Sequence, residues 1–177
     1  MKIIKSSLAL VVLLIVIITI CSCEEENPLR NAKLDYSNKR APSFRITDLS
    51  GITISLDALQ GKVVFINFFA TWCSPCRMEI PFFVDLYAKY HAQGFEIIGI
   101  SIDQYGGTDL IKKFSSMYKI NYPVGLLTED IANKYRGITG VPTTLIIDKN
   151  GDINQAIVGP RSKEEFEKII TGLLTPG

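Results

Sequence analysis

The sequence predicts an α/β fold in which a mixed central sheet is flanked by helices and preceded by an N-terminal hairpin. Two apolar runs of strand length, residues 63–69 and 95–102, lie on either side of a segment with helical spacing over 74–93. A strand, a helix and a second strand in this order place the two strands parallel. Further along, Asp148–Gly151 separates two more apolar runs and predicts an antiparallel hairpin, which makes the sheet mixed.

The first elements follow from turn residues and apolar periodicity. Residues 44–47 and 52–55 flank the turn-forming cluster Asp48–Gly51, a pattern that predicts the N-terminal hairpin. A short helical turn is expected over 55–59 and stops at Gly61. The apolar run that follows is continuous, as expected for a strand covered on both faces.

The helix expected over 74–93 carries apolar residues at nearly helical spacing and ends at Gly94. Pro81 lies inside it and should kink it, because proline lacks the backbone donor and clashes with the preceding turn. The remaining elements are a helix over 109–118 capped by Thr108, a short helix over 131–135 closed by Gly137, strands over 143–147 and 153–158, and a last helix that begins with the capping box Ser162–Glu165 and runs through Leu174.

The composition of the chain excludes several classes of function. Of the 177 residues, 47% are hydrophobic, which is enough for one core, and 19 Lys and Arg residues balance 18 acidic ones. This balance leaves no basic field to attract nucleic acid. The four cysteines occur as two closely spaced pairs, Cys21 with Cys23 and Cys73 with Cys76, which is not the pattern of a small disulfide-stapled scaffold.

Residues 1–23 are expected to direct export. A positively charged start is followed by an apolar run over 8–20, which is shorter than the about 20 residues of a spanning helix and matches a signal peptide. Ile20–Cys23 resembles a bacterial lipobox, which implies that Cys23 becomes the lipidated first residue of the mature protein. An uncleaved anchor and plain cleavage are the alternatives.

Residues 24–40 are expected to form a tether, because they are polar, carry mixed charge and show no sustained period. An ordered N-terminal arm in which Leu34 and Tyr36 pack on the domain is the alternative. The folded domain is then expected over residues 41–177.

The segment Cys73–Cys76, preceded by Trp72, lies where a predicted strand gives way to a predicted helix. Two thiols at this spacing can close one small disulfide ring, and a helix N-terminus favours the thiolate of the first. Cys73 is therefore the expected exposed nucleophile, and Cys76 is the shielded resolving thiol. A structural disulfide and half of a zinc site are the alternatives. Zinc is disfavoured because His91 is the only histidine and there is no second C-x-x-C.

Two segments resemble the signatures of thioredoxin-like proteins. Residues 64–76 resemble their active-site segment, and Gly140–Thr144 resembles their cis-proline loop. The likeness is closest to the exported, membrane-tethered thiol-disulfide oxidoreductases of the TlpA/ResA type, and it extends over residues 41–174. It implies a thioredoxin-like fold, protein disulfides and dithiols as substrates, and a membrane or periplasmic electron donor, with no cofactor or metal.

The resemblance also implies how a partner is held. Pro142 matches the cis-proline that faces the active-site cysteines, and a cis bond there exposes the backbone of Val141 to a polypeptide that pairs with it like an added strand. An ordinary trans proline at the start of a strand is the alternative. Trp72 is expected to pack beside the disulfide and to form part of the docking surface.

Asn67 departs from the thioredoxin pattern, in which a buried aspartate assists proton transfer from the inner cysteine. An amide cannot take up a proton at ordinary pH. Glu79, three residues after Cys76, resembles an acidic residue near the thiols of the ResA-type subgroup and is the expected acid-base or partner-recognition group. A solvated glutamate, favoured electrostatically in the first helical turns, is the alternative.

The sequence therefore predicts a membrane-anchored thiol-disulfide oxidoreductase in the periplasm or on the outer face of the membrane. Reduction of apocytochrome c is the best-known task of the subgroup that it resembles. A peroxiredoxin-like peroxidase is one alternative, but no proline precedes Thr71 in the usual peroxidatic arrangement. A non-catalytic peptide-binding module is another, and the intact pair Cys73 and Cys76 argues against it.

Overall fold

The structure is a computed structural model that describes residues 39–136, 138 and 140–175. The predicted export segment, the lipidation site at Cys23 and the tether up to residue 38 lie outside the described residues. Within the described part of the chain, no helix combines the length and the apolar character that crossing a membrane requires.

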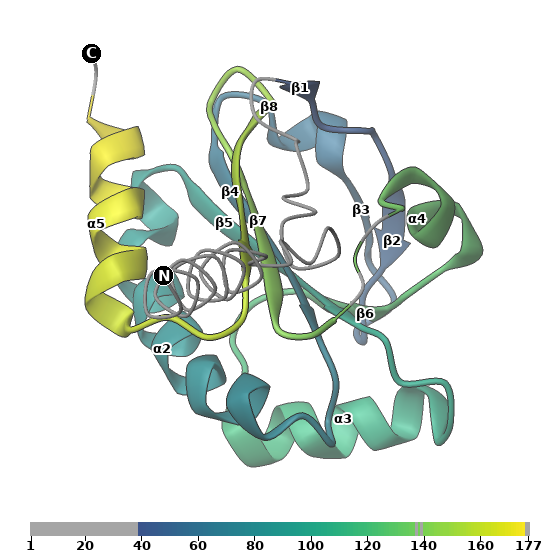
Figure 1. Ribbon diagram of the computed structural model, residues 1–177. Coiled ribbons are helices and arrows are strands. Elements are labelled where there is room, and N and C mark those ends of the chain that lie inside the picture. The colour runs from purple at the N-terminus through teal and green to yellow at the C-terminus, as the bar shows by residue number, and fades with distance from the viewer. Residues whose placement is uncertain (1–38, 137, 139, 176–177) are drawn as a thin grey trace, which may run out of the picture. The chain divides into compact units, whose positions relative to one another are not determined.

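The centre of the fold is a sheet of six strands, shown in Figure 1: β1 (Lys39–Arg40), β4 (Val63–Phe69), β5 (Phe95–Ser101), β6 (Val124–Leu126), β7 (Thr143–Ile147) and β8 (Asp152–Val158). Their order across the sheet is β1-β8-β7-β4-β5-β6. β4, β5 and β6 run parallel, whereas β7 is antiparallel to both β4 and β8. The mixed sheet predicted from the sequence is thus confirmed.

Helices cover both faces of the sheet: α2 (Ser74–Tyr90), α3 (Gly107–Tyr118), α4 (Glu129–Lys134) and α5 (Lys163–Leu174), with 3₁₀ helices η1 (Leu56–Leu59) and η2 (His91–Gln93). Alternate side chains of β4 enter two separate buried clusters. One cluster contains residues of α2, α3 and α5, and the other contains residues of η1, α4 and the N-terminal hairpin. That hairpin is the antiparallel pair β2 (Arg45–Thr47) and β3 (Thr53–Ser55).

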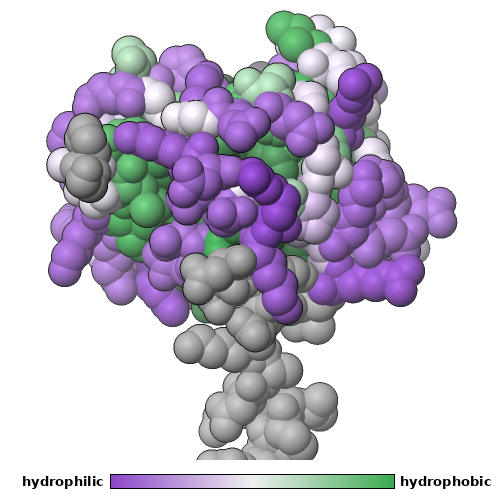
Figure 2. Space-filling model, turned by 90° about the horizontal axis from the view of Figure 1, so that it is seen from above, coloured by the Kyte–Doolittle hydropathy of each residue, from purple (hydrophilic) through white to green (hydrophobic). Residues whose placement is uncertain are grey.

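The candidate site lies at the edge of the sheet where β4 and β5 end. All seven residues of β4 are buried, and its C-terminal end leads directly toward α2. Because β4 and β5 are parallel, the loops that follow them meet at one edge, where Ile102 N donates to the Phe69 carbonyl over 2.9 Å. Figure 2 views the molecule from above, and the surface on that side is mostly hydrophilic, with smaller apolar areas between the polar side chains.

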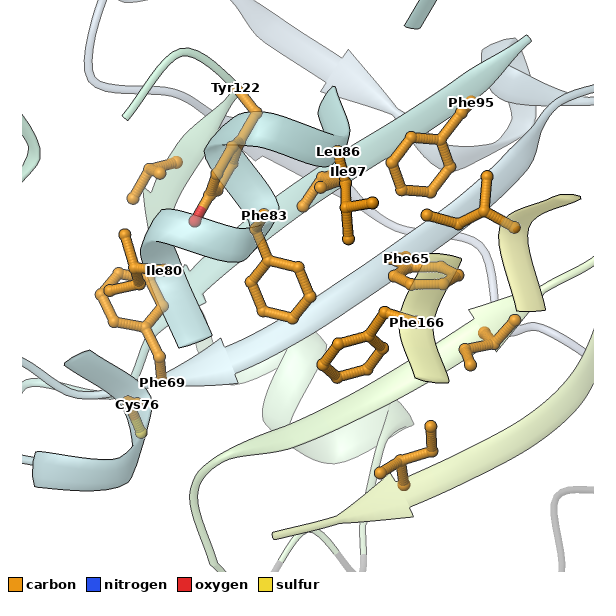
Figure 3. Close-up of a cluster of buried hydrophobic side chains, with 14 of the residues drawn as sticks. Phe65, Phe69, Cys76, Ile80, Phe83, Leu86, Phe95, Ile97, Tyr122 and Phe166 are labelled. Atoms are coloured by element: carbon orange, nitrogen blue, oxygen red, sulfur yellow. The ribbon is translucent and has the colours of Figure 1, made fainter. Parts of the chain in front are cut away.

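Aromatic side chains hold α5 and α2 on the sheet (Figure 3). Phe166 of α5 is fully buried, and its ring centroid lies 4.9 Å from that of Phe83 and 5.9 Å from that of Phe65.

Phe166→Ala is expected to lower the free energy of unfolding by about 3–5 kcal/mol, because the truncation leaves a cavity between helix and sheet. Chemical denaturation measures this loss, and Phe166→Leu is the control with a smaller cavity. A loss below about 1 kcal/mol for the alanine variant would contradict this anchoring role.

One prediction about the middle of the chain needs correction, and one strand there was not predicted. α3 begins at Gly107 after an N-cap glycine, Gly106, whose φ of 83° is left-handed, and no side chain caps it. Thr108 therefore lies inside the helix. β6 was not predicted, because three residues around Gly125 show no apolar period; its pairing with β5 is what defines it.

The start of the domain also differs from the prediction. Lys39 and Arg40, which were assigned to the tether, form β1 and pair antiparallel with the first residues of β8. At the other end of the domain, the predicted capping box is confirmed. Ser162 Oγ accepts from Glu165 N over 3.2 Å, and Ser162 N donates to Glu165 Oε2 over 2.9 Å.

Candidate active site

α2 begins at the reactive segment, with Cys73 as its N-cap and Pro75 in the first turn, where no intrahelical donor is required. A disulfide joins Cys73 to Cys76, and their Cα atoms are 5.3 Å apart. The backbone N–H of Cys76 donates to Cys73 Sγ over 3.2 Å. In the reduced protein, this donor and the positive end of the helix favour the thiolate of Cys73.

Both cysteines are buried, which corrects the expectation that Cys73 is exposed. Cys73 is 5% exposed and Cys76 is 1% exposed. As the N-cap residue, Cys73 turns its sulfur back over the first turn toward the Cys76 N–H, and this inward direction withdraws it from solvent. Cys76 is the more shielded of the two, as predicted, but by a small margin.

The cis-proline loop lies next to this segment because β7 pairs with β4. The Val141–Pro142 peptide bond is cis, as the resemblance implies. Thr143, the first residue of β7, pairs with Phe68 near the C-terminal end of β4. The carbonyl of Pro142 accepts a hydrogen bond from Gly159 N over 2.9 Å, which ties the loop to the segment that follows β8.

A groove of about 730 Å³ is bordered by both signature segments. Trp72, which is 67% exposed, forms part of its wall, and Val141 forms another part. Pockets that hold ligands have volumes of about 300–1,000 Å³, so the groove can accept side chains of a partner. Its apolar lining includes Phe68, Ile102, Leu127, Ile131, Tyr135 and Ile138.

Glu79 is buried in α2, and this excludes the alternative of a solvated glutamate. It is 2% exposed, and its Oε1 accepts a hydrogen bond from Arg161 N over 2.7 Å, whereas its buried Oε2 has no hydrogen-bond partner among the described residues. Burial raises the pKa of the Glu79 carboxyl to about 7, although the hydrogen bond from Arg161 and the Arg161 charge oppose the rise. The Glu79 charge adds to the burial that raises the pKa of Tyr122.

Asn67 is a buried link between strands. Its Nδ2 donates to Thr144 Oγ1 over 3.0 Å, which joins β4 to β7. The side chain therefore stabilises the sheet beside the site and has no proton to exchange. Within residues 39–136, 138 and 140–175, no group of three or more His, Cys, Asp or Glu side chains is placed to hold a metal ion.

Asp103 was missed in the sequence, although it lies against the loop that leads to Cys73. Its Oδ2 accepts from Thr71 N over 3.0 Å and from Ser101 Oγ over 2.6 Å, and its Oδ1 accepts from Thr71 Oγ1 over 2.8 Å. The Thr71 carbonyl accepts from Arg77 Nη1 over 2.9 Å. The only signal in the sequence is an acidic residue two positions after a strand that lies parallel to β4.

Comparison with known sequences gives one family and a consistent set of relatives. A family model described as the AhpC/TSA family matches residues 37–156. The thiol-disulfide oxidoreductase ResA of Bacillus thuringiensis (strain Al Hakam) is 42% identical over 133 residues, which cover 73% of each protein. The protein of the same name from Geobacillus kaustophilus (strain HTA426) is 38% identical over 130 residues, which cover 72% of each.

Solved structures give the same picture. A thiol:disulfide interchange protein of the thioredoxin family from Chlorobium tepidum TLS superposes with a TM-score of 0.73 at 36% identity, covering 78% of this chain and 97% of that one. A putative thiol:disulfide interchange protein DsbE from Chlorobium tepidum has a TM-score of 0.71 at 30% identity, covering 78% and 98%. The thioredoxin-like fold implied by the sequence is confirmed.

Proposed function

The chain belongs to the AhpC/TSA family and is a thiol-disulfide oxidoreductase of the ResA and DsbE type, and on this premise we propose that it reduces disulfides of other proteins outside the cytoplasm. The observation that carries the proposal is the Cys73–Cys76 pair at the N-terminus of α2, beside a groove that Trp72 and Val141 both border. This arrangement provides a nucleophile, a resolving thiol and a place for the partner chain.

The first step uses Cys73. In the reduced protein, its thiolate attacks one sulfur of the partner disulfide, and the second partner sulfur leaves as a thiolate that takes up a proton from water. A mixed disulfide then joins Cys73 to the partner. The N–H of Cys76 and the positive end of α2 support this role, because both stabilise the negative sulfur before the attack.

The second step uses Cys76 and Glu79. The carboxylate of Glu79 accepts the proton of the Cys76 thiol, and the resulting thiolate attacks Cys73 Sγ. The partner sulfur leaves as a thiolate and is protonated, so two electrons and two protons have passed to the partner disulfide. The new Cys73–Cys76 disulfide is reduced again by an external dithiol donor in the membrane or periplasm. A buried carboxyl with a pKa of about 7, one helical turn after Cys76, supports this assignment.

Partner binding is assigned to the groove and the cis-proline loop. We expect the partner chain to run along Val141 as an added strand and to place side chains against Trp72. Pro142 keeps the backbone before it turned toward the partner. Among protein disulfides, we propose that of an apocytochrome c C-x-x-C-H segment as a substrate, on the strength of the resemblance to ResA-type proteins.

We also propose the predicted layout for the N-terminal part of the chain: export by residues 1–23, attachment through Cys23, and a tether between Cys23 and β1. The support is the sequence pattern of the segment. This layout would hold the domain close to the outer face of a membrane.

Cys23 is expected to carry lipid and to be the first residue of the protein extracted from bacterial membranes. The reason is the lipobox-like pattern after a short apolar run. Intact-mass measurement tests this, with Cys23→Ser expected to remain unprocessed and Cys21→Ser, the matched control, expected to be processed normally. An unmodified start at Met1 in the parent protein would support the uncleaved anchor instead.

The direction of electron flow is tested by the reduction potential of the Cys73–Cys76 couple, measured by equilibration with glutathione or dithiothreitol buffers. A reductase requires a value near that of thioredoxin, about −270 mV, whereas a value near that of DsbA, about −120 mV, would make the protein an oxidant and contradict the proposal.

A further inference from the structure

Both oxygens of the Asp103 carboxylate accept hydrogen bonds from donors of the chain itself. The two oxygens accept three hydrogen bonds, and two of the three come from Thr71, through the backbone N–H and the hydroxyl. Hydrogen bonds to an ionised carboxylate are shorter and stronger than neutral ones. Two of these bonds tie Asp103 to the loop that leads to Cys73, so the carboxylate is placed to anchor that loop.

Thr71 is held at each of its polar groups. Asp103 fixes its N–H and hydroxyl, and Arg77 fixes its carbonyl. The next two residues are Trp72, whose side chain is exposed on the groove, and Cys73. The anchor therefore lies directly before the exposed Trp72 and the attacking Cys73.

We propose that Asp103 is a positioning residue: through Thr71 it holds Trp72 and the adjoining wall of the groove in the geometry onto which a partner protein docks. This inference rests on the proposed function, because it concerns binding of a protein disulfide. Asp103 and Trp72 both line the groove. The thiols have supports besides Asp103, since Cys73 N donates to the Ala70 carbonyl over 3.1 Å and Cys76 N donates to Cys73 Sγ over 3.2 Å in the first turn of α2.

Asp103→Asn tests the proposal, because the amide nitrogen that replaces one oxygen cannot accept a hydrogen bond from Thr71. The KM for a protein disulfide is expected to rise about tenfold with kcat nearly unchanged, since a docking geometry populated about a tenth of the time weakens apparent binding tenfold. Reduction of a small aromatic disulfide, which needs no groove, is expected to keep the parent rate. Trp72 is the only tryptophan in the chain, and its fluorescence anisotropy is expected to fall.

Three further variants distinguish loss of the anchor from loss of a negative charge and from loss of the fold. Asp109→Asn removes the same charge from an exposed position in α3 and is expected to match the parent protein. Thr71→Ser keeps both bonds to Asp103 and should also match it. Thr71→Val loses only the hydroxyl bond to Asp103. It should shift KM and anisotropy in the same direction as Asp103→Asn, but by a smaller amount. If Asp103→Asn does not fold, Thr71→Val tests the anchoring role in its place.

Two results would overturn the proposal. One is an unchanged KM and anisotropy in both Asp103→Asn and Thr71→Val. The other is an equal loss of rate toward protein and small disulfides, which would place Asp103 in the thiol chemistry. Failure of the proposed function looks different: the parent protein would then not reduce a protein disulfide at all, while the anisotropy of Trp72 would still report whether Asp103 anchors the loop.

Discussion

Cys73→Ser is expected to abolish reduction of protein disulfides, whereas Cys76→Ser is expected to accumulate a mixed disulfide with its partner. The first variant lacks the attacking thiolate, and the second attacks but has no thiol to release the partner. Gel electrophoresis without reductant, followed by mass spectrometry of the linked peptides, measures both results. The trapped partner should be joined to Cys73.

The assignment of the two roles rests on a small difference in accessibility and on the hydrogen bond that Cys73 Sγ accepts. Alkylation of the reduced protein with a limiting amount of reagent is the control. Cys73 should be labelled first, because it is less shielded and its thiolate is favoured by the helix N-terminus. Labelling of Cys76 before Cys73, or a mixed disulfide on Cys76 in the Cys73→Ser variant, would reverse the roles.

Glu79→Gln is expected to slow the resolving step about 100-fold above pH 7, as loss of a general base typically does. Because the pKa of the Glu79 carboxyl is raised to about 7, the carboxylate is present above this pH and is lost as the pH falls below it. The parent rate should therefore drop from neutral toward acidic pH. The variant should lack this titration, and the two rates should approach each other at about pH 5.

The decay of a preformed mixed disulfide on Cys73, followed from mildly acidic to alkaline pH, isolates this step from the first attack. Glu164→Gln, which neutralises an exposed carboxyl in α5, is the matched control and should keep the parent profile. Superimposable profiles for the parent protein and Glu79→Gln would contradict a role for Glu79 in proton transfer.

The Glu79 carboxyl is also expected to make the free energy of unfolding depend on pH. Its native pKa lies above the unfolded value of about 4.3, so between these two values the folded state binds more protons than the unfolded state. The free energy of unfolding of the parent protein should therefore decrease as the pH rises through this window. Glu79→Gln should remove that decrease and remain folded, which separates a titrating group from a merely structural one.

Much of the fold could be predicted because its signals are local. The continuous apolar run of β4, the turn residues of the two hairpins and the capping box of α5 each depend on neighbours in the sequence, and each appears in the structure. The reactive pair was found for the same reason, since Cys73 and Cys76 stand at a strand-to-helix junction. β1 and β6 were not found, because they pair with strands far along the chain, whereas the equally short β2 and β3 pair across an adjacent turn.

The parts of the site that escaped prediction depend on residues far apart in the sequence. Asp103 reaches Thr71 across 32 positions, and the N–H of Arg161 reaches Glu79 across 82. No local pattern reveals such contacts. The burial of Cys73 was also missed, because position at a helix start does not determine in which direction an N-cap side chain turns.

The Cys73–Cys76 dithiol is expected to pass its two electrons to a protein disulfide. In a single-turnover experiment, the fully reduced protein is mixed with an excess of an oxidised protein substrate, and thiols are counted on both proteins. Peroxide consumption is measured in parallel. One substrate disulfide should be reduced for each Cys73–Cys76 disulfide formed. Rapid consumption of peroxide with no reduction of the substrate disulfide would contradict it and identify a thiol peroxidase.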